Sequence, residues 1–159
     1  MSAEPTEIVR KRLVELLSGG SAHAKFDQVV KKWPVELRGR KPQGAAHTPW
    51  QVLEHLRLCQ WDILEFSRDP HHKSPPFPDG YWPETEEPPL PESWDRSIAQ
   101  FRLDLDAMKT LVESPEMDLF QPFPWGDGQD LLREAMLVAD HNAYHIGEMM
   151  VLRRLLGIS

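Results

Sequence analysis

The chain has 159 residues, of which 40% are hydrophobic and 27% charged, a composition typical of a soluble domain with a buried core. Its formal net charge of −7 argues against nucleic-acid binding, which needs a basic face to neutralise phosphates. The single cysteine, Cys59, excludes an intrachain disulfide and favours the reducing cytoplasm. No apolar run approaches the roughly 20 residues of a membrane span, and no signal peptide is evident. We expect one cytoplasmic domain over residues 1–159.

The first helical signals come in two pieces. Residues 4–17 carry Ile8, Leu13, Leu16 and Leu17 on an apolar stripe that ends before two glycines, and residues 21–33 carry a second stripe that ends before a proline. We interpret the pieces as parts of one broken first helix. Residues 34–47 are rich in proline, glycine and basic side chains, which predicts a loop.

The segment HTPWQVLEHLRLCQWDILEF predicts the second helix. Thr48 can cap its start, Pro49 suits the first helical position, and Gln51 completes a capping box. The apolar seam at steps of three and four includes His55 and Cys59, so both side chains should face inward. We expect this helix to end near Ser67.

A long connection follows, because residues 70–91 hold eight of the fifteen prolines. Proline has a fixed φ and no amide proton, so neither a helix nor a central strand is plausible there. Connections of this length inside a compact domain are functional or disordered. The aromatic residues Phe77, Tyr81 and Trp82 predict an ordered crossover that they anchor to the rest of the molecule.

Two further helices complete the expected fold. The third begins at Glu92 and ends before Ser114, and the fourth runs from about Gln129 to Leu156, after a second loop. No convincing β alternation is present. The pattern predicts an all-α four-helix bundle, in which the long crossover lets helices two and three run parallel.

Three histidines on these helices suggest a metal site. In ADHNAYHIGEMM, His141 and His145 are four residues apart, so both leave the same face of the fourth helix. His55 faces inward from the second helix, and the three imidazoles can therefore converge. Three nitrogen ligands leave a coordination position for water, as in catalytic metal sites. Imidazole is a suitable ligand for zinc, nickel, copper and ferrous iron, so the residues alone do not determine which metal binds.

The three histidines also allow other interpretations. Buried histidines often serve only as hydrogen-bonded core residues. Asn142 stands where a zincin would have its general-base glutamate, so a zincin peptidase is not indicated. No glutamate lies three residues before any of the three histidines, so a ferritin-like di-iron centre is not supported either.

Several neighbours of the histidines are candidates for supporting roles. Glu148, Glu54 and Tyr144 are candidates for proton transfer, with Glu148 closest to the face of His145. Cys59 can act as a fourth ligand or redox thiol, although buried cysteines usually serve as small apolar residues. The remaining candidates are Asp140 and Asn142 for orienting a ligand, His47 for the rim of the site, and His23, His71 and His72 for local roles.

The segments HTPWQVLEHLRLCQWDILEF and LLREAMLVADHNAYHIGEMMVLRRLLG, together with GGSAHAKFDQVV and SPPFPDGYWP, resemble the DinB/YfiT-like superfamily of metal-binding four-helix bundles. His55, His141 and His145 match its three histidines. The resemblance implies an up-down-down-up bundle, a nickel or zinc ion (iron or manganese as alternatives), and a homodimer. It implies a metal-dependent hydrolase or a thiol-dependent S-transferase of the bacillithiol or mycothiol type; a non-catalytic, metal-stabilised dimeric bundle is the third possibility. We expect a small-molecule substrate, with Glu148 as the candidate catalytic residue.

Overall fold

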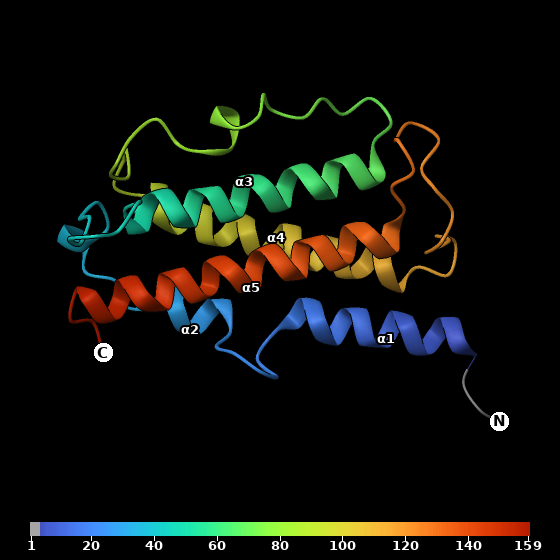
Figure 1. Cartoon of the computed structure of the whole chain (residues 1–159), viewed down its shortest axis with the longest axis horizontal. Helices are drawn as coiled ribbons and strands as arrows, with labels where there is room; N and C mark the ends of the chain where they lie inside the picture. The colour runs from blue at the N-terminus through green and yellow to red at the C-terminus, as the bar shows by residue number, and fades with distance from the viewer. Residues whose placement is uncertain (1–3) are drawn as a thin grey trace.

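The computed structural model describes residues 4–159, and every regular element in that range is a helix. Four helices are long and lie side by side: α1 (Pro5–Ser18), α3 (Pro49–Arg68), α4 (Ser93–Glu113) and α5 (Leu131–Leu155) (Figure 1). Three elements are short: α2 (Phe26–Val30) and the 3-10 turns η1 (Val35–Leu37) and η2 (Asp79–Tyr81). The fold is therefore all-α over the described residues, as the sequence predicts.

The first part of the chain is more broken than predicted. Helix α2 covers only five residues of the expected 21–33 segment, and it continues the line of α1 after a gap (Figure 1). The helix is followed by Lys32, whose positive φ of 53° is incompatible with a helix. The stripe predicted for α1 is also only partly right, because Leu13 and Leu17 are buried whereas Ile8 and Leu16 are exposed.

Helix α3 begins as its sequence predicts. The Thr48 side chain accepts a hydrogen bond from the Gln51 amide at 3.2 Å, and the Gln51 side chain accepts one from the Thr48 amide at 3.0 Å. Both interactions satisfy amides that the first turn of a helix leaves without partners. The helix ends at Arg68, one residue beyond the expected Ser67.

The connection between α3 and α4 returns along the length of the molecule. In Figure 1, α3 and α4 run in the same direction, opposite to α1 and α5, and the green segment between them passes over α3. Tyr81 and Trp82 are half-buried against the helices, but Phe77 is 88% exposed. The prediction that Phe77 anchors the crossover is therefore wrong, because its ring projects from the segment into solvent.

A buried polar contact holds α3, α4 and α5 together near their middle. The Gln60 amide donates to the backbone oxygen of Phe101 at 2.7 Å, and the Asn142 amide donates to the Gln60 side-chain oxygen at 2.9 Å. Buried side-chain amides need such partners, so these bonds favour one alignment of the three helices. Apolar clusters pack around this contact toward both ends of the molecule. The alignment of α3 with α5 decides which of their side chains can meet.

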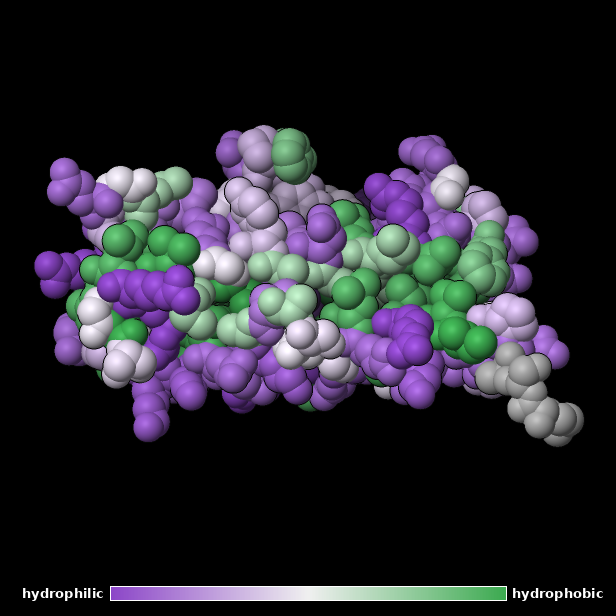
Figure 2. Space-filling view, turned by 60° about the horizontal axis from the view of Figure 1, so that its bottom comes forward, coloured by the Kyte–Doolittle hydropathy of each residue, from purple (hydrophilic) through white to green (hydrophobic). Residues whose placement is uncertain are grey.

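The outer face of α5 is partly apolar. Figure 2 shows a band of hydrophobic residues along the molecule, and on α5 the exposed large apolar side chains include Met136, Tyr144, Val151 and Leu155. Their spacing of eight, seven and four residues places them on one side of the helix. Among the described residues, no helix combines the length and apolarity that crossing a membrane requires.

Candidate metal centre

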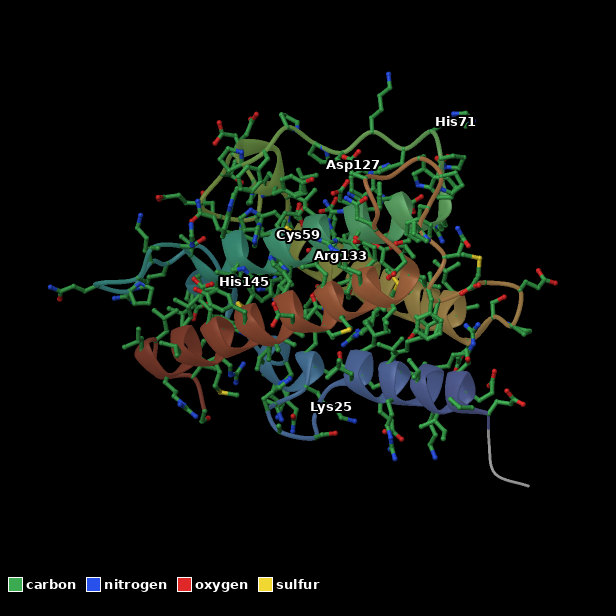
Figure 3. The ribbon with its side chains drawn as sticks, turned by 45° about the vertical axis from the view of Figure 1, so that its right-hand side comes forward. Lys25, Cys59, His71, Asp127, Arg133 and His145 are labelled. Carbon is green, nitrogen blue, oxygen red and sulfur yellow. The ribbon has the colours of Figure 1, made fainter. Side chains whose placement is uncertain are left out.

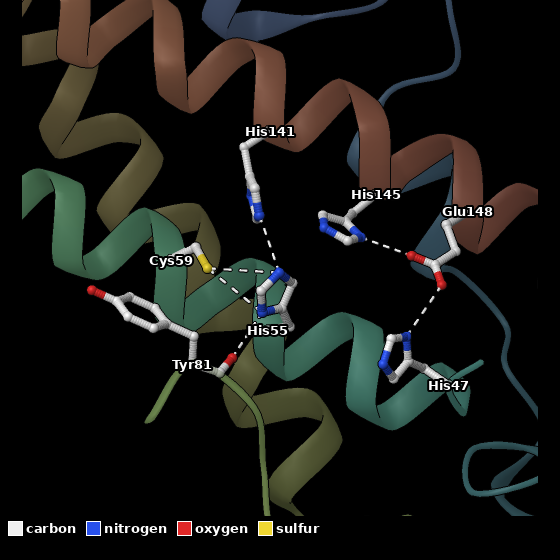
Figure 4. Close-up of polar contacts among 7 residues, drawn as sticks. All are labelled: His47, His55, Cys59, Tyr81, His141, His145 and Glu148. Atoms are coloured by element: carbon white, nitrogen blue, oxygen red, sulfur yellow. Dashed lines mark hydrogen bonds and ion pairs between the residues drawn. The ribbon is translucent and has the colours of Figure 1, made fainter. Parts of the chain in front are cut away.

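The structure brings the three predicted histidines together between α3 and α5 (Figure 4). His55 comes from α3, and His141 and His145 come from successive turns of α5. One ring nitrogen from each lies within 4.8 Å of the other two, and the Nε2 atoms of His55 and His141 are 3.1 Å apart. Three donors this close can surround a single cation.

Two of the rings are held through their other nitrogen. The Nδ1 of His55 donates to the backbone oxygen of Tyr81 at 2.8 Å, and the Nδ1 of His145 donates to the Glu148 carboxylate at 2.7 Å. A carbonyl and a carboxylate can only accept, so each Nδ1 carries the proton. In the neutral rings, Nε2 then keeps its lone pair. Such outer contacts fix the tautomer and orientation of metal-ligating histidines.

The surroundings keep two of the rings neutral. Burial, together with the neighbouring histidines, lowers the pKa of His55 to about 4 and that of His141 to about 3. At neutral pH both rings are therefore neutral, and each can offer a nitrogen lone pair to a shared cation. The Nδ1 of His141 is buried and has no hydrogen-bond partner. The donor set and its protonation thus fit a divalent metal ion.

His47 joins the rim of the centre through an aromatic stack. The Trp82 ring lies between His55 and His47, with ring centroids 3.8 Å and 3.9 Å away. The Nδ1 of His47 is 3.6 Å from the Glu148 carboxylate, whose other oxygen accepts from His145. Hydrogen bonding to His145 lowers the pKa of Glu148, so the carboxylate stays ionised. Glu148 therefore lies on the outer side of His145, where it can orient the ring.

Cys59 lies one turn along α3 from His55. Its Sγ is 3.6 Å and 3.7 Å from the two ring nitrogens of His55. Burial and the nearby charge of Asp62 raise the pKa of Cys59 to about 12, so the thiol keeps its proton at neutral pH. This environment suits a small buried side chain better than a reactive thiolate.

The other candidates for proton transfer, Glu54 and Tyr144, form no hydrogen bond with the three histidines. Glu54 binds Arg57 on its own helix and accepts a hydrogen bond from Ser97 of α4 at 2.8 Å. Tyr144 is 74% exposed, although its ring edge contacts His145. Neither side chain is directed into the centre.

The remaining sequence candidates have local roles or none that the structure shows. Asp140 is exposed, and the amide of Asn142 binds Gln60 rather than a histidine. His23 is exposed, and His71 lies far from Cys59 and His145 in Figure 3. His72 donates to Asp62 at 2.7 Å, which attaches the start of the crossover to α3.

Sequence reasoning did not identify which atoms of the crossover contact the histidines. It predicted Tyr81 and Trp82 as anchors, whereas the structure also gives them contacts with His55. The sequence PDGYWP shows aromatic residues inside a proline-rich segment. It does not show that Tyr81 and Trp82 contact His55, which lies 26 and 27 residues earlier in the chain. A pocket of about 470 Å³ opens beside His55 and His141, under this part of the crossover.

Comparison of the sequence with protein-family models places the chain in a family. The sequence model of the DinB superfamily matches residues 21–149, a range that contains all three histidines. The chain belongs to the DinB superfamily. Comparison with curated proteins and with solved structures gives no significant match. The resemblance seen in the histidine segments is thus confirmed, and the three-histidine cluster of this DinB-superfamily chain fits a metal-binding protein.

Proposed function

We propose that this DinB-superfamily chain is a metal-dependent hydrolase with one divalent cation on His55, His141 and His145. The observation that carries the proposal is the convergence of three ring nitrogens, two of them on rings whose pKa is lowered far below neutrality. A site with three protein ligands and an open position is typical of catalytic rather than structural zinc. We assign the fold to the up-down-down-up four-helix bundle.

The metal we propose is zinc or nickel, with iron or manganese as alternatives. Three neutral imidazoles leave the full charge of a divalent cation in place, which favours an anionic fourth ligand. When bound, such a cation supplies Lewis acidity and a nucleophile at neutral pH.

The protein's own residues orient and enclose this chemistry. The backbone oxygen of Tyr81 and the carboxylate of Glu148 hold two of the rings with Nδ1 protonated. The half-buried Trp82 covers His55 from the crossover side and restricts access of water. In this proposal Glu148 is a positioning residue, and a substrate reaches the centre through the adjoining pocket.

Hydrolysis is tested with protein stripped by a chelator and reloaded with zinc or nickel. We expect turnover of neutral ester or amide substrates only in the loaded protein, and at least about a hundredfold loss in His145→Ala. The Tyr144→Phe variant, changed at an exposed neighbour, serves as the control. Turnover that survives His145→Ala contradicts the proposal. If an added thiol consumes an electrophile in a metal-dependent reaction and no hydrolysis is detected, the hydrolase proposal fails and S-transfer is the function supported.

We further propose that two copies of the chain associate through the outer face of α5. The exposed apolar side chains on this face are one reason. Gly147 is a second, because a Cβ added there would meet no atom within 4 Å. Glycine inside a helix costs roughly 1 kcal/mol relative to alanine, and no packing within the chain explains it. Close packing of α5 from a second copy would explain why a residue without a side chain occupies this position.

A further inference from the structure

The pocket beside the centre has a composition that restricts what it can hold. Its volume of about 470 Å³ lies within the range of small-molecule sites, and it opens between α3, α5 and the crossover. His55 and His141 form one part of its wall. Most of the remaining wall is aromatic or aliphatic: Ile63, Phe77, Pro78, Tyr81, Trp82 and Leu137.

Apart from the two proposed metal ligands, the pocket wall offers no free acidic or basic side chain. None of its lining residues is a lysine or arginine. Asp62 is the one carboxylate, and both its oxygens are engaged, one by the Tyr81 hydroxyl at 2.7 Å and the other by His72 Nε2 at 2.7 Å. An anionic group entering this pocket would lose water and find no lysine or arginine on the wall, and a cationic group would find only a carboxylate whose two oxygens are already engaged.

Two exposed apolar side chains mark the mouth of the pocket. Phe77 from the crossover is 88% exposed, and Leu137 from α5 is 37% exposed. They belong to different elements and line the same opening. Large apolar side chains that stay in water beside a pocket can bury area when a ligand enters. Phe77 makes little contact with the helices, so anchoring the crossover does not account for it.

We propose that this pocket binds the uncharged, apolar part of the substrate, of about the size of a phenyl ring or a branched alkyl chain. The inference rests on the proposed function only in placing the hydrolysed bond at the His55 and His141 end. The substrate class is then a neutral aryl or alkyl ester or amide. A thiol cofactor that carries carboxylates finds no cationic partner among the residues of the wall.

Binding is tested without catalysis, on the metal-free full-length protein, by ligand-observed NMR titration with three probes. Acetanilide is the neutral probe, and 4-acetamidobenzoate and 4-acetamidobenzylammonium add one charge of either sign to the same ring. We expect acetanilide to bind at least about tenfold more tightly than either charged probe. Phe77→Ala should weaken acetanilide binding at least about fivefold. Phe120→Ala, at an exposed phenylalanine outside the pocket, should not change it.

The outcomes separate this inference from the proposed function. Equal affinity for the three probes, no acetanilide binding, or equal effects of Phe77→Ala and Phe120→Ala would overturn the inference. If acetanilide binds as expected but the metal-loaded protein never hydrolyses neutral esters, the hydrolase proposal fails and the pocket assignment stands. If hydrolysis of an aryl ester occurs and its KM is the same in Phe77→Ala, the pocket assignment fails and the hydrolase proposal stands.

Discussion

At the scale of single residues, the histidines differ in what holds them. His55 is fixed by a backbone oxygen of the crossover, and His145 is fixed by Glu148 from its own helix. His141 has no partner on its outer nitrogen, and its other ring nitrogen lies 3.1 Å from Nε2 of His55. Because an outer hydrogen bond orients a ligating ring and raises its basicity, the affinity of the centre for metal should depend on Glu148.

Replacing Glu148 tests this dependence. We expect Glu148→Ala to weaken zinc affinity about 10- to 100-fold, since His145 loses the acceptor that orients it. Glu148→Gln keeps an acceptor oxygen and should lose less. Asp140→Ala removes an exposed carboxylate from the same helix and should leave the affinity unchanged. Competition titration against a chromogenic chelator measures all three variants, and equal losses in Glu148→Ala and Asp140→Ala would refute the role.

The lowered pKa values of His55 and His141 predict how the metal-free protein responds to acid. Their ordinary value is 6.5, and burial lowers the pKa to about 4 and about 3 in the folded state. Between pH 6.5 and these lower values, the two histidines are protonated in the unfolded chain but not in the folded one. The stability that the neutral rings contribute is therefore fully present above about pH 6.5 and decreases as the pH falls. We expect the urea midpoint in chelator to decrease from pH 7.5 to pH 5, and His141→Gln to remove about half of the histidine contribution. A midpoint that stays constant would contradict the burial of these rings.

The sequence predicts the ligands better than it predicts their supports. His141 and His145 follow from a four-residue spacing. The closeness of Glu148 to His145 follows from its place three residues further on, but the sequence indicated it for proton transfer and indicated Asp140 or Asn142 for orienting a ligand. The partner of His55 could not be found in this way. It is a backbone oxygen 26 residues away, and any residue can supply one, so no side-chain pattern marks it.

At the scale of elements, the crossover acts as one wall of the centre. Its residue Trp82 stacks on His55 and His47, and its residues His72 and Tyr81 both bind Asp62 of α3. These contacts lie near its start and its middle. The many prolines reduce the entropy lost when such a segment becomes ordered. The ordering of the crossover and the shape of the metal centre are therefore coupled.

Trp82→Ala should loosen this element. We expect limited proteolysis of the native variant to cut within residues 70–91 at least about tenfold faster than in the unchanged protein, because local opening costs less free energy. Phe77→Ala removes an aromatic ring from the same segment that contacts little, and it should not change the rate. Rapid cutting of the unchanged protein throughout this segment would show that the crossover is not held in place.

Elements with local signals were predictable, and those decided by packing were not. The start of α3 follows from Thr48, Pro49 and Gln51, whose interactions are all within one turn. The failure of residues 21–33 to form one helix depends on how α2 packs beside α5 and on the positive φ of Lys32, neither of which the apolar spacing reveals.

At the scale of the whole molecule, the apolar outer face of α5 predicts association. Val151 lies on this face, and Val151→Glu would bury a charge between two copies. We expect the unchanged protein to sediment as a dimer at tens of micromolar and the variant as a monomer. Leu103→Glu, at an exposed leucine of α4, is the matched control and should remain dimeric. A monomeric unchanged protein would contradict the association.

The central claim is that one divalent ion binds each chain on three histidines from two helices. Elemental analysis of the purified protein tests it most directly, with His55→Ala, His141→Ala, His145→Ala and the double variant His141→Ala/His145→Ala purified in parallel. We expect about one divalent ion per unchanged chain, zinc or nickel in the proposed function, and none in the double variant, because a single remaining imidazole cannot hold the ion. The exposed His23→Ala serves as the control and should keep its metal. Full occupancy in the double variant would contradict the account.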